Sequence, residues 1–555
     1  MGRIQTFLVE LRSRNVLRAA AFYAASSWLV VQIATQVFPF FNIADWVVRW
    51  IVIASVVGFP FAVLLSWFYE WTPQGLQRDS DLPADAPARR ETGRKLDRAI
   101  IVMLALAVIV LVSDRFVRHG DSATPPDKSI AVLPLVNASG DPKDEYFSDG
   151  LTDELTAALA QIGGFTVMGR NSSFQFKHSN AGSTAIGEKL GVATLLEGSV
   201  RREGSRVRIV AALINAVDGR QLWSQTYDGE LDDVFALQSD IARAIADALR
   251  VQLQPARGER TVTHHVPRFE TYDHFLLGSH VLSHNGDFRI AVSELSQAVA
   301  LEPTYAEAWA NLAMAESFLA ENDPNSPMAA AGRRRAMSAA QRAVALDPQL
   351  GTAYAARGFL RADSDHDWDG ALADLRKSLR LDPNEARNQL RYGYVLAAVG
   401  RLREADAAIS KGIAHDPLFP PLWAMLSWIK AAQGDVGGAR RATQRLLAIN
   451  PEDRAAATYL GVLALLQGDA GSARAIAAKL DRPGLLAMAE HDLGQSARAK
   501  RALDTVIATR STIAAYQIAQ VYAWIGDNDQ AFAWLDRAMR QHETDLIRIK
   551  YDPLL

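Results

Sequence analysis

Acidic side chains gather at one point of the sequence, between Asp141 and Glu154. Carboxylates so close together could bind a cation or act as general acid and base. They also lie where an apolar strand pattern gives way to a helical one, so they could instead cap that helix and complement its positive N-terminal end. We favour capping. The residues concerned are Asp141, Asp144, Glu145, Asp149, Asp153 and Glu154.

A second acidic run has part of the spacing of a calcium-binding loop. Asp365, Asp367, Asp369 and Gly370, which follow Asp363, fit positions one, three, five and six of an EF-hand loop. Position twelve should be a bidentate glutamate, but it is Arg376. We therefore expect a turn between two helices, and no calcium.

Other reactive side chains lack the patterns that chemistry requires. The stretch from Gly169 to Ser173 lacks the Lys-Ser/Thr ending of a phosphate-binding loop, and no H-E-x-x-H zinc motif occurs. The absence of cysteine excludes disulfides and thiol nucleophiles. We predict a protein that is not an enzyme, with no catalytic residue, cofactor or metal ligand. We interpret the histidines His264, His265 and His274 as satisfied or solvated, and the arginines Arg201, Arg202, Arg206 and Arg208 around Gly204 as solvated.

The composition indicates a folded chain of several domains. The chain has 555 residues, of which 49% are hydrophobic and 22% charged, which is typical of globular protein. That length favours two to four domains. A net charge of −3 supplies no positive field for nucleic acid.

Short proline signatures recur in the second half of the chain. Each ends an apolar helical run, and the last four prolines are 35, 34 and 34 residues apart. A period near 34 resembles the tetratricopeptide repeat, a helix–turn–helix unit that stacks into a solenoid. We expect about eight units over 268–542, with packing alanines early in each second helix. The signatures end at Pro303, Pro348, Pro383, Pro417 and Pro451, and the alanines are Ala291, Ala336, Ala371, Ala405, Ala439, Ala473 and Ala531.

The middle of the chain predicts an α/β domain over 128–254. Strand and helix patterns follow in the order β-α-β-α-β-β-β-α. This region resembles the TolB-type domain, also seen in FlgO-like proteins. Three segments carry the resemblance: IAVLPLVNASGDPKDEYFSDGLTDELTAAL, LLEGSVRREGSRVRI and LWSQTYDGELDDVFALQSDIA. This resemblance implies that any activity of relatives lies in an attached winged-helix, kinase or cyclase module. We find no such module in this sequence.

Three apolar stretches near the start predict membrane-spanning helices, at about 19–39, 46–69 and 99–117. Arginines precede the first stretch, residues 39–45 hold no basic side chain, and residues 71–98 hold six. Because basic loops stay in the cytoplasm, we expect a bacterial inner-membrane protein with a cytoplasmic N-terminus and periplasmic C-terminal domains.

The predicted organisation is a membrane module (1–118), a linker (119–127), the TolB-like domain (128–254), a second linker (255–267), the repeats (268–542) and a tail (543–555). We predict a membrane-anchored periplasmic scaffold that assembles an envelope complex by binding a protein or peptide in its repeat groove. The sequence leaves it undecided whether the chain forms a homo-oligomer, and it does not identify the residues that line the groove. We do not expect nucleic acid as a partner. One alternative is a transmembrane sensor that relays a periplasmic signal to a cytoplasmic partner, and a less favoured one is a cyclase-like enzyme.

Overall fold

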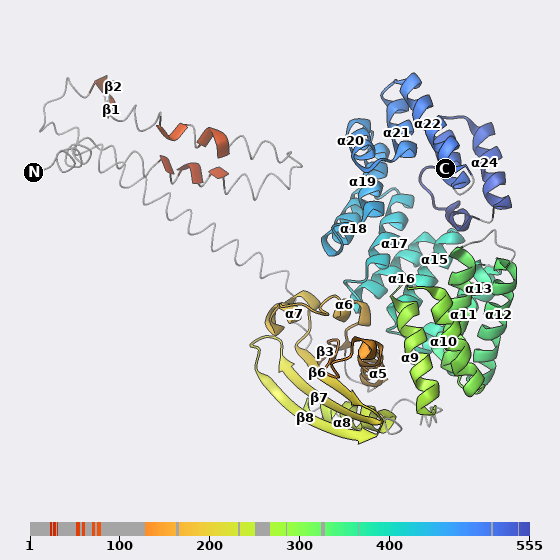
Figure 1. The fold of residues 1–555 in the computed structure, drawn as a ribbon. Coiled ribbons are helices and arrows are strands. Elements are labelled where there is room, and N and C mark those ends of the chain that lie inside the picture. The colour runs from red at the N-terminus through yellow and green to blue at the C-terminus, as the bar shows by residue number, and fades with distance from the viewer. Residues whose placement is uncertain are drawn as a thin grey trace, which may run out of the picture. The chain divides into compact units, whose positions relative to one another are not determined.

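The computed structural model describes short pieces between Tyr23 and Arg78, and then most of the chain from residue 128 (Figure 1). The later ranges are 128–161, 166–230, 234–249, 267–284, 286–322, 328–363, 366–511, 514–541 and 543–555. The chain divides into two compact units, Met1–Ala123 and Thr124–Leu555.

The first unit requires a correction to the expected fold class. Within the residues that the structure describes, no helix is both long and apolar enough to cross a bilayer, so the class with three membrane-spanning helices is wrong. Most of the predicted spans at 19–39 and 46–69, and all of 99–117, lie outside the described residues. Where the second span was expected to end, β1 (Tyr69–Thr72) and β2 (Gly75–Arg78) pair antiparallel.

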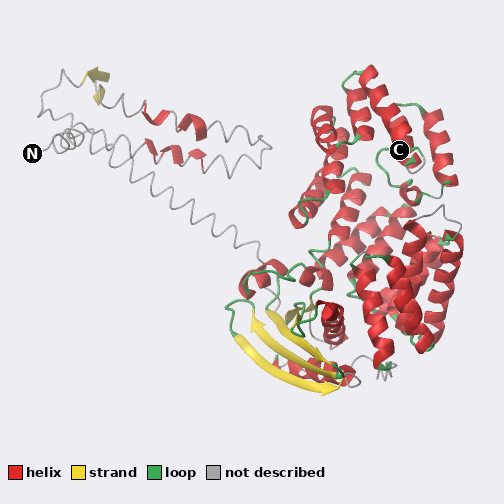
Figure 2. Cartoon of the chain, viewed as in Figure 1, coloured by secondary structure: helices red, strands yellow, loops and turns green. Residues whose placement is uncertain are grey.

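The second unit begins with a mixed β-sheet in the strand order β5-β3-β6-β7-β8 (Figure 2). Strand β3 is parallel to both of its neighbours, β5 and β6, whereas β6, β7 and β8 form an antiparallel meander. Turns at Gly204 and Gly219, both with positive φ, join the meander strands. The bounds are β3 (Ser129–Val132), β4 (Val136–Asn137), β5 (Thr166–Val167), β6 (Thr194–Glu203), β7 (Arg206–Asn215) and β8 (Gln221–Glu230).

Helices cover both faces of this sheet. Along β3, Ile130 and Val132 pack into one apolar cluster with residues of α5 (Glu145–Gln161) and α8 (Val234–Ala248). Their neighbours Ala131 and Leu133 pack on the opposite face with α7 (Ser183–Leu190). This alternation follows from the period of two along a strand.

The second strand of the predicted order is short and is followed by a helix. Of the stretch from Phe165 to Phe176, only β5 is a described strand, and α6 (Arg170–Phe174) follows it. The helix forms there because its N-terminal N–H groups find an acceptor far along the chain, on Asp416.

Paired antiparallel helices make up the rest of the second unit. The pairs are α9 (Phe269–Ser283) with α10 (Phe288–Leu301), α11 (Ala306–Asn322) with α12 (Ala329–Leu346), α13 (Gly351–Asp363) with α14 (Trp368–Leu381), α15 (Ala386–Ala398) with α16 (Leu402–His415), α17 (Pro420–Ala432) with α18 (Val436–Ile449), α19 (Arg454–Leu466) with α20 (Ala470–Leu480), α21 (Pro483–Asp492) with α22 (Ser496–Arg510), and α23 (Ala515–Trp524) with α24 (Asn528–Arg540). First helices lie beside the next first helix, as in α13, α15 and α17, so they form the inner layer of a solenoid.

Small residues set the close approach within each pair, as predicted. All seven packing alanines are buried. A Cβ added at Gly393 of α15 would lie 2.6 Å from Ile409 of α16. The pair that is longer in sequence, between Pro303 and Pro348, has longer helices, with 17 residues in α11 and 18 in α12. The alanine-rich sequence after Met328 favours helix over turn.

The α/β domain is packed against the solenoid at two places. A continuous apolar cluster runs from Leu151 of α5 to Tyr272 and Leu276 of α9. At the second place, the Asp416 carboxylate accepts hydrogen bonds from the N–H of Ser172 (2.7 Å) and from Asn171 Nδ2 (2.7 Å), and also from the Ser172 hydroxyl. The two parts therefore share one core.

Candidate peptide-binding groove

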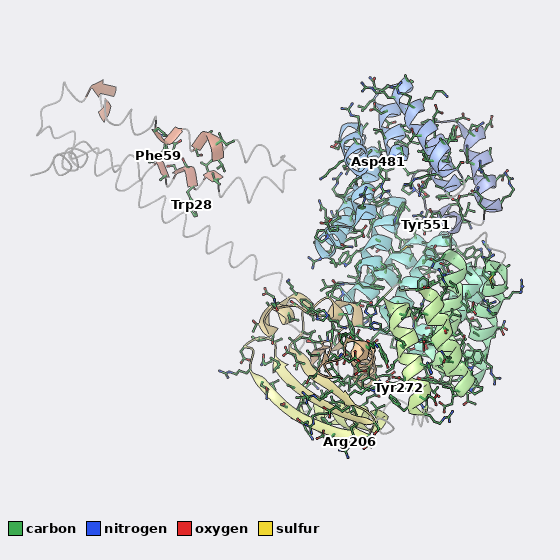
Figure 3. All side chains as sticks on the ribbon, in the orientation of Figure 1. Trp28, Phe59, Arg206, Tyr272, Asp481 and Tyr551 are labelled. Carbon is green, nitrogen blue, oxygen red and sulfur yellow. The ribbon has the colours of Figure 1, made fainter. Side chains whose placement is uncertain are left out.

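The segment after α24 folds back onto the inner layer of the solenoid. It begins with the short helix η5 (Thr544–Arg548) and continues through Tyr551 to Leu555 (Figure 3). Tyr551 is 3% exposed and packs in the apolar cluster of Val395 and Met425, whereas Leu554 packs in the next cluster with Leu463. This segment, which turns on itself at Arg548–Tyr551 and again at Asp552–Leu555, thus lies on the inner layer, where solenoid repeats usually hold a peptide.

Asp552 fixes the register of this segment. Its carboxylate is 7% exposed and accepts hydrogen bonds from the Tyr516 hydroxyl (2.9 Å) and from Gln520 Nε2 (2.6 Å), both on α23. The other carboxylate oxygen accepts the N–H of Leu554 at 3.0 Å. Burial and the negative charge of Asp552 raise the pKa of Tyr516 well above its usual value, so the phenol stays a hydrogen-bond donor.

Aromatic rings line the groove under the segment. Trp428 of α17 and Tyr459 of α19 have ring centroids 4.1 Å apart. The Arg548 guanidinium lies 4.8 Å from the Trp428 ring centroid, within the range of a cation–π interaction. Arg548 also pairs with Asp545 at 2.5 Å. The groove therefore holds a cationic group of the segment against an aromatic ring.

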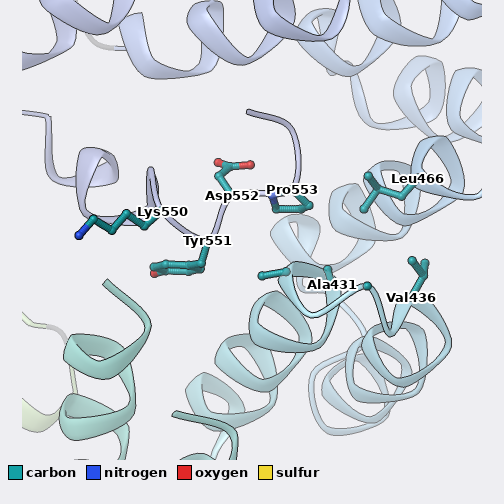
Figure 4. A pocket seen from close by; sticks show the side chains of 9 residues that line it. Ala431, Val436, Leu466, Lys550, Tyr551, Asp552 and Pro553 are labelled. Atoms are coloured by element: carbon teal, nitrogen blue, oxygen red, sulfur yellow. The ribbon is translucent and has the colours of Figure 1, made fainter. Parts of the chain in front are cut away.

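A pocket of about 480 Å³ lies beside the seated segment (Figure 4). Its walls come from α17, the turn into α18, α19 and the segment itself, at Ala431, Ala432, Gly434, Val436, Leu466, Lys550, Tyr551, Asp552 and Pro553. The space shows that the segment does not fill the groove.

Several polar atoms in the groove are left without partners. Tyr459 Oη, Arg548 Nε and Tyr551 Oη are buried and make no hydrogen bond within the described part of the chain. Each such atom costs about 1–3 kcal/mol. The segment is therefore held less tightly than an optimised ligand would be.

The acidic cluster between Asp141 and Glu154 does not serve chiefly to cap a helix. Asp141 does cap, accepting the N–H of Lys143 at 2.9 Å. Asp149, however, lies inside α5 and pairs with Lys177 at 2.5 Å, and Asp153 pairs with Arg170 at 2.5 Å. The capping interpretation was therefore wrong for these two residues, because basic side chains from the following segment reach them. Among the rest, Glu145 pairs with Lys177 and Asp144 with Arg202.

The other sequence candidates fall into separate structural roles. Asp367 caps α14 by accepting the N–H of Gly370 at 3.0 Å, while Asp365 lies outside the described residues. His274 contacts Glu294, with 2.6 Å between Nδ1 and Oε2, and His264 and His265 also lie outside the described residues.

The arginines around Gly204 are not all alike. Arg202 reaches α9, where it lies 3.1 Å from Asp273, so the solvated interpretation was wrong for this residue. The other three keep side chains more than half exposed, and they are Arg201, Arg206 and Arg208.

Sequence reasoning did not assign the groove residues, although one signal was available. Tyr394 and Trp428 are one repeat of 34 residues apart on first helices, and both border the folded-back segment. Aromatic residues at one repeat position predict an inner-face site. Tyr516, Gln520 and Asp552 carry no such periodic signal.

Comparison with known proteins gives partial likenesses. The chain matches no protein-family model. It is 42% identical over 149 residues to a protein of Rhizobium meliloti strain 1021 named putative adenylate cyclase 3, which is 27% of this chain and 25% of that protein. The chain thus spans about a quarter of the length of the curated relative it matches.

Solved structures resemble the helical part. A crystal structure of PilW, a type IV pilus biogenesis factor, shares 19% identity over 42% of this chain and 98% of its own, with a TM-score of 0.33. A tetratricopeptide-repeat protein of Thermus thermophilus shares 18% identity over 35% and 99%, with a TM-score of 0.30. PilF of Pseudomonas aeruginosa shares 16% identity over 38% and 91%, with a TM-score of 0.32.

Proposed function

We propose that this protein is a protein–protein interaction scaffold whose solenoid groove binds an extended segment of a partner. The observation that carries the proposal is the folded-back segment, whose Tyr551 and Asp552 occupy sites built from α15, α17 and α23. The partner segment should offer the same chemistry: an aromatic residue, then an acid, then proline and leucine.

A peptide-binding experiment tests this function. A labelled peptide with the sequence of residues 549–555 should bind a variant that lacks residues 543–555. The full chain should bind it at least about tenfold more weakly, because the groove is already occupied. Fluorescence anisotropy measures both affinities.

Matched variants in the shortened chain locate the binding site. Trp428→Ala removes an aromatic ring of the groove and should weaken peptide binding about tenfold or more. Phe532→Ala removes a ring that is 69% exposed on α24, a second helix, and should leave binding unchanged. Equal affinity in these two variants, or no binding by the shortened chain, would contradict the proposed groove.

We further propose that the α/β domain is TolB-like and that the scaffold works in a bacterial envelope, with the residues after Thr124 in the periplasm. The support is the sequence alone, namely the quoted segments that resemble the TolB-type domain. A phosphatase reporter, which is active only outside the cytoplasm, should be active when it is fused after Ser122. A silent reporter at that position would contradict this location.

A role in cyclic-nucleotide signalling is the second candidate, because of the 149-residue likeness to the protein named putative adenylate cyclase 3. We propose that the chain contributes binding rather than catalysis to such signalling. Purified chain incubated with ATP should therefore form no cyclic AMP, and measurable turnover would contradict the proposal.

A further inference from the structure

An aspartate and two histidines meet between α5 and α9, away from the groove. Asp149 lies on α5, His280 on α9, and His284 directly after α9. One ligand atom of each residue lies within 4.8 Å of those of the other two. His280 and His284 are four positions apart, which places both on one side of the helix end.

Two of the facing atoms are buried and poorly satisfied. Asp149 is 1% exposed, and its Oδ2 lies 3.2 Å from His280 Nδ1. Neither atom makes a well-oriented hydrogen bond within the described residues. Zinc bonds to nitrogen and oxygen are about 2.0–2.1 Å long, so two tetrahedral ligands lie about 3.3 Å apart. The observed separation is thus close to that of two ligands on one zinc ion.

The surrounding contacts orient these side chains. Lys177 Nζ donates to Asp149 Oδ1 at 2.5 Å, which leaves Oδ2 facing His280. His284 Nδ1 contacts the His280 carbonyl oxygen at 2.8 Å, which leaves its Nε2 for a ligand bond. Supporting hydrogen bonds of this kind fix metal ligands in proteins.

The charges of the cluster favour a cation that prefers nitrogen ligands. Lys177 and the nearby Arg170 oppose any cation held by charge alone. Two imidazoles and one carboxylate suit zinc better than magnesium or calcium.

We propose that Asp149, His280 and His284 form a binding site for a divalent transition-metal cation, of which zinc fits best. Bound there, the ion would join α5 of the α/β domain to α9 of the first repeat. The sequence-based expectation was that the chain holds no metal; it weighed Asp149 only as part of the acidic patch, and among the histidines it considered His264, His265 and His274.

Zinc titration of the metal-free full chain tests the proposal. We expect one zinc ion per chain by isothermal titration calorimetry, and a higher melting temperature with zinc. Loss of a supporting contact already weakens metal sites about 10–100-fold, so His284→Ala should weaken zinc binding at least about 100-fold. His274→Ala is the matched control on the same helix, since His274 contacts Glu294 instead, and should bind zinc normally.

A second measurement keeps the test decisive if a variant is unstable. Cobalt added to the metal-free chain should give the visible absorption of a site with nitrogen ligands, and Asp149→Asn and His284→Ala should each change it. Circular dichroism verifies that both variants are folded. Absence of saturable zinc binding, or the same affinity in His284→Ala as in the unchanged chain, would overturn the proposal.

Discussion

At the scale of single residues, Asp416 has two roles. It belongs to a repeat signature, His415-Asp416-Pro417, and it also caps a helix of another domain, since its carboxylate accepts the backbone and side-chain hydrogens of Asn171 and Ser172. A Cβ added at Gly169 would lie 2.6–2.8 Å from the Asp416 side chain, so a glycine is needed there. The contact therefore depends on residues about 245 positions apart.

Replacing Asp416 should loosen the α/β domain from the solenoid. Asp416→Ala leaves the N-terminus of α6 without its acceptor, and we expect a loss of about 1.5–3 kcal/mol in the free energy of unfolding. Urea unfolding measures the loss, and limited proteolysis should show faster cleavage near α6. Asp347→Ala is the control in an earlier signature, where the side chain only accepts the N–H of Gln349. If both variants cleave at the same rate near α6, Asp416 does not hold the domains together.

Glu321 should make stability depend on pH. Burial, and then the nearby charge of Asp363, raise its pKa to about 7. Because the folded state holds this proton more tightly than the unfolded chain does, the stabilisation is complete below about pH 4.5 and is lost as the pH rises through about 7. Glu321→Gln should match the unchanged protein at pH 4.5 and exceed it by about 1–3 kcal/mol at pH 8. Thermal unfolding at both pH values measures this, with exposed Glu452→Gln as the control; equal curves at pH 8 would contradict it.

At the scale of elements, the helix pairs depend on small residues at their crossing points. Ala405 of α16 is fully buried, and a Cβ added at Gly393 of α15 would lie 3.4 Å from its carbonyl oxygen. A closely packed crossing of this kind has no room for a larger side chain. The register of the predicted repeats is therefore consistent with the observed packing.

Ala405→Trp should overpack the contact between α15 and α16, at a cost of roughly 1–3 kcal/mol or more. The damage should begin locally, because each repeat contacts chiefly its neighbours. Hydrogen exchange should rise first in α15 and α16. Ala407→Trp places the same side chain at an exposed position of α16 and should change little. Similar exchange in both variants would mean that the crossing tolerates bulk.

At the scale of the whole molecule, the α/β domain shares the core on one face of its sheet with the solenoid. The cluster that contains Leu155 of α5 continues through Tyr272 and Phe275 to Leu312 of α11. We therefore expect the sheet and the first repeats to unfold together, whereas a sequence divided into domains favours separate transitions.

Tyr272→Ala tests this shared core. The ring is 1% exposed, and its loss should cost about 3–5 kcal/mol. Hydrogen exchange should increase in parallel in the sheet (residues 194–230) and in α9 to α11. Tyr516→Ala removes an equally buried ring at the other end of the solenoid and should affect only the last repeats and the folded-back segment. Protection of the sheet in Tyr272→Ala would show that the two cores are independent.

The sequence by itself determined the local structure of the second unit. Proline signatures and alanines at a period near 34 predicted helix pairs, because each pair buries its own apolar stripe. Period-two alternation predicted β7, where every second side chain is buried from Val207 to Leu213. Apolar length alone was not sufficient in the first unit, where β1 begins at the predicted end of a span.

Only the tertiary structure decided the sites. Asp416 meets Ser172, Asp552 meets Tyr516, and Asp149 meets His280 across 36 to 244 residues of chain. No local pattern encodes such contacts, because they depend on how the solenoid curves and on which face of it is left for the α/β domain and the folded-back segment. Periodicity predicts which face of a helix is buried, whereas the partner of that face is set by packing of the whole chain.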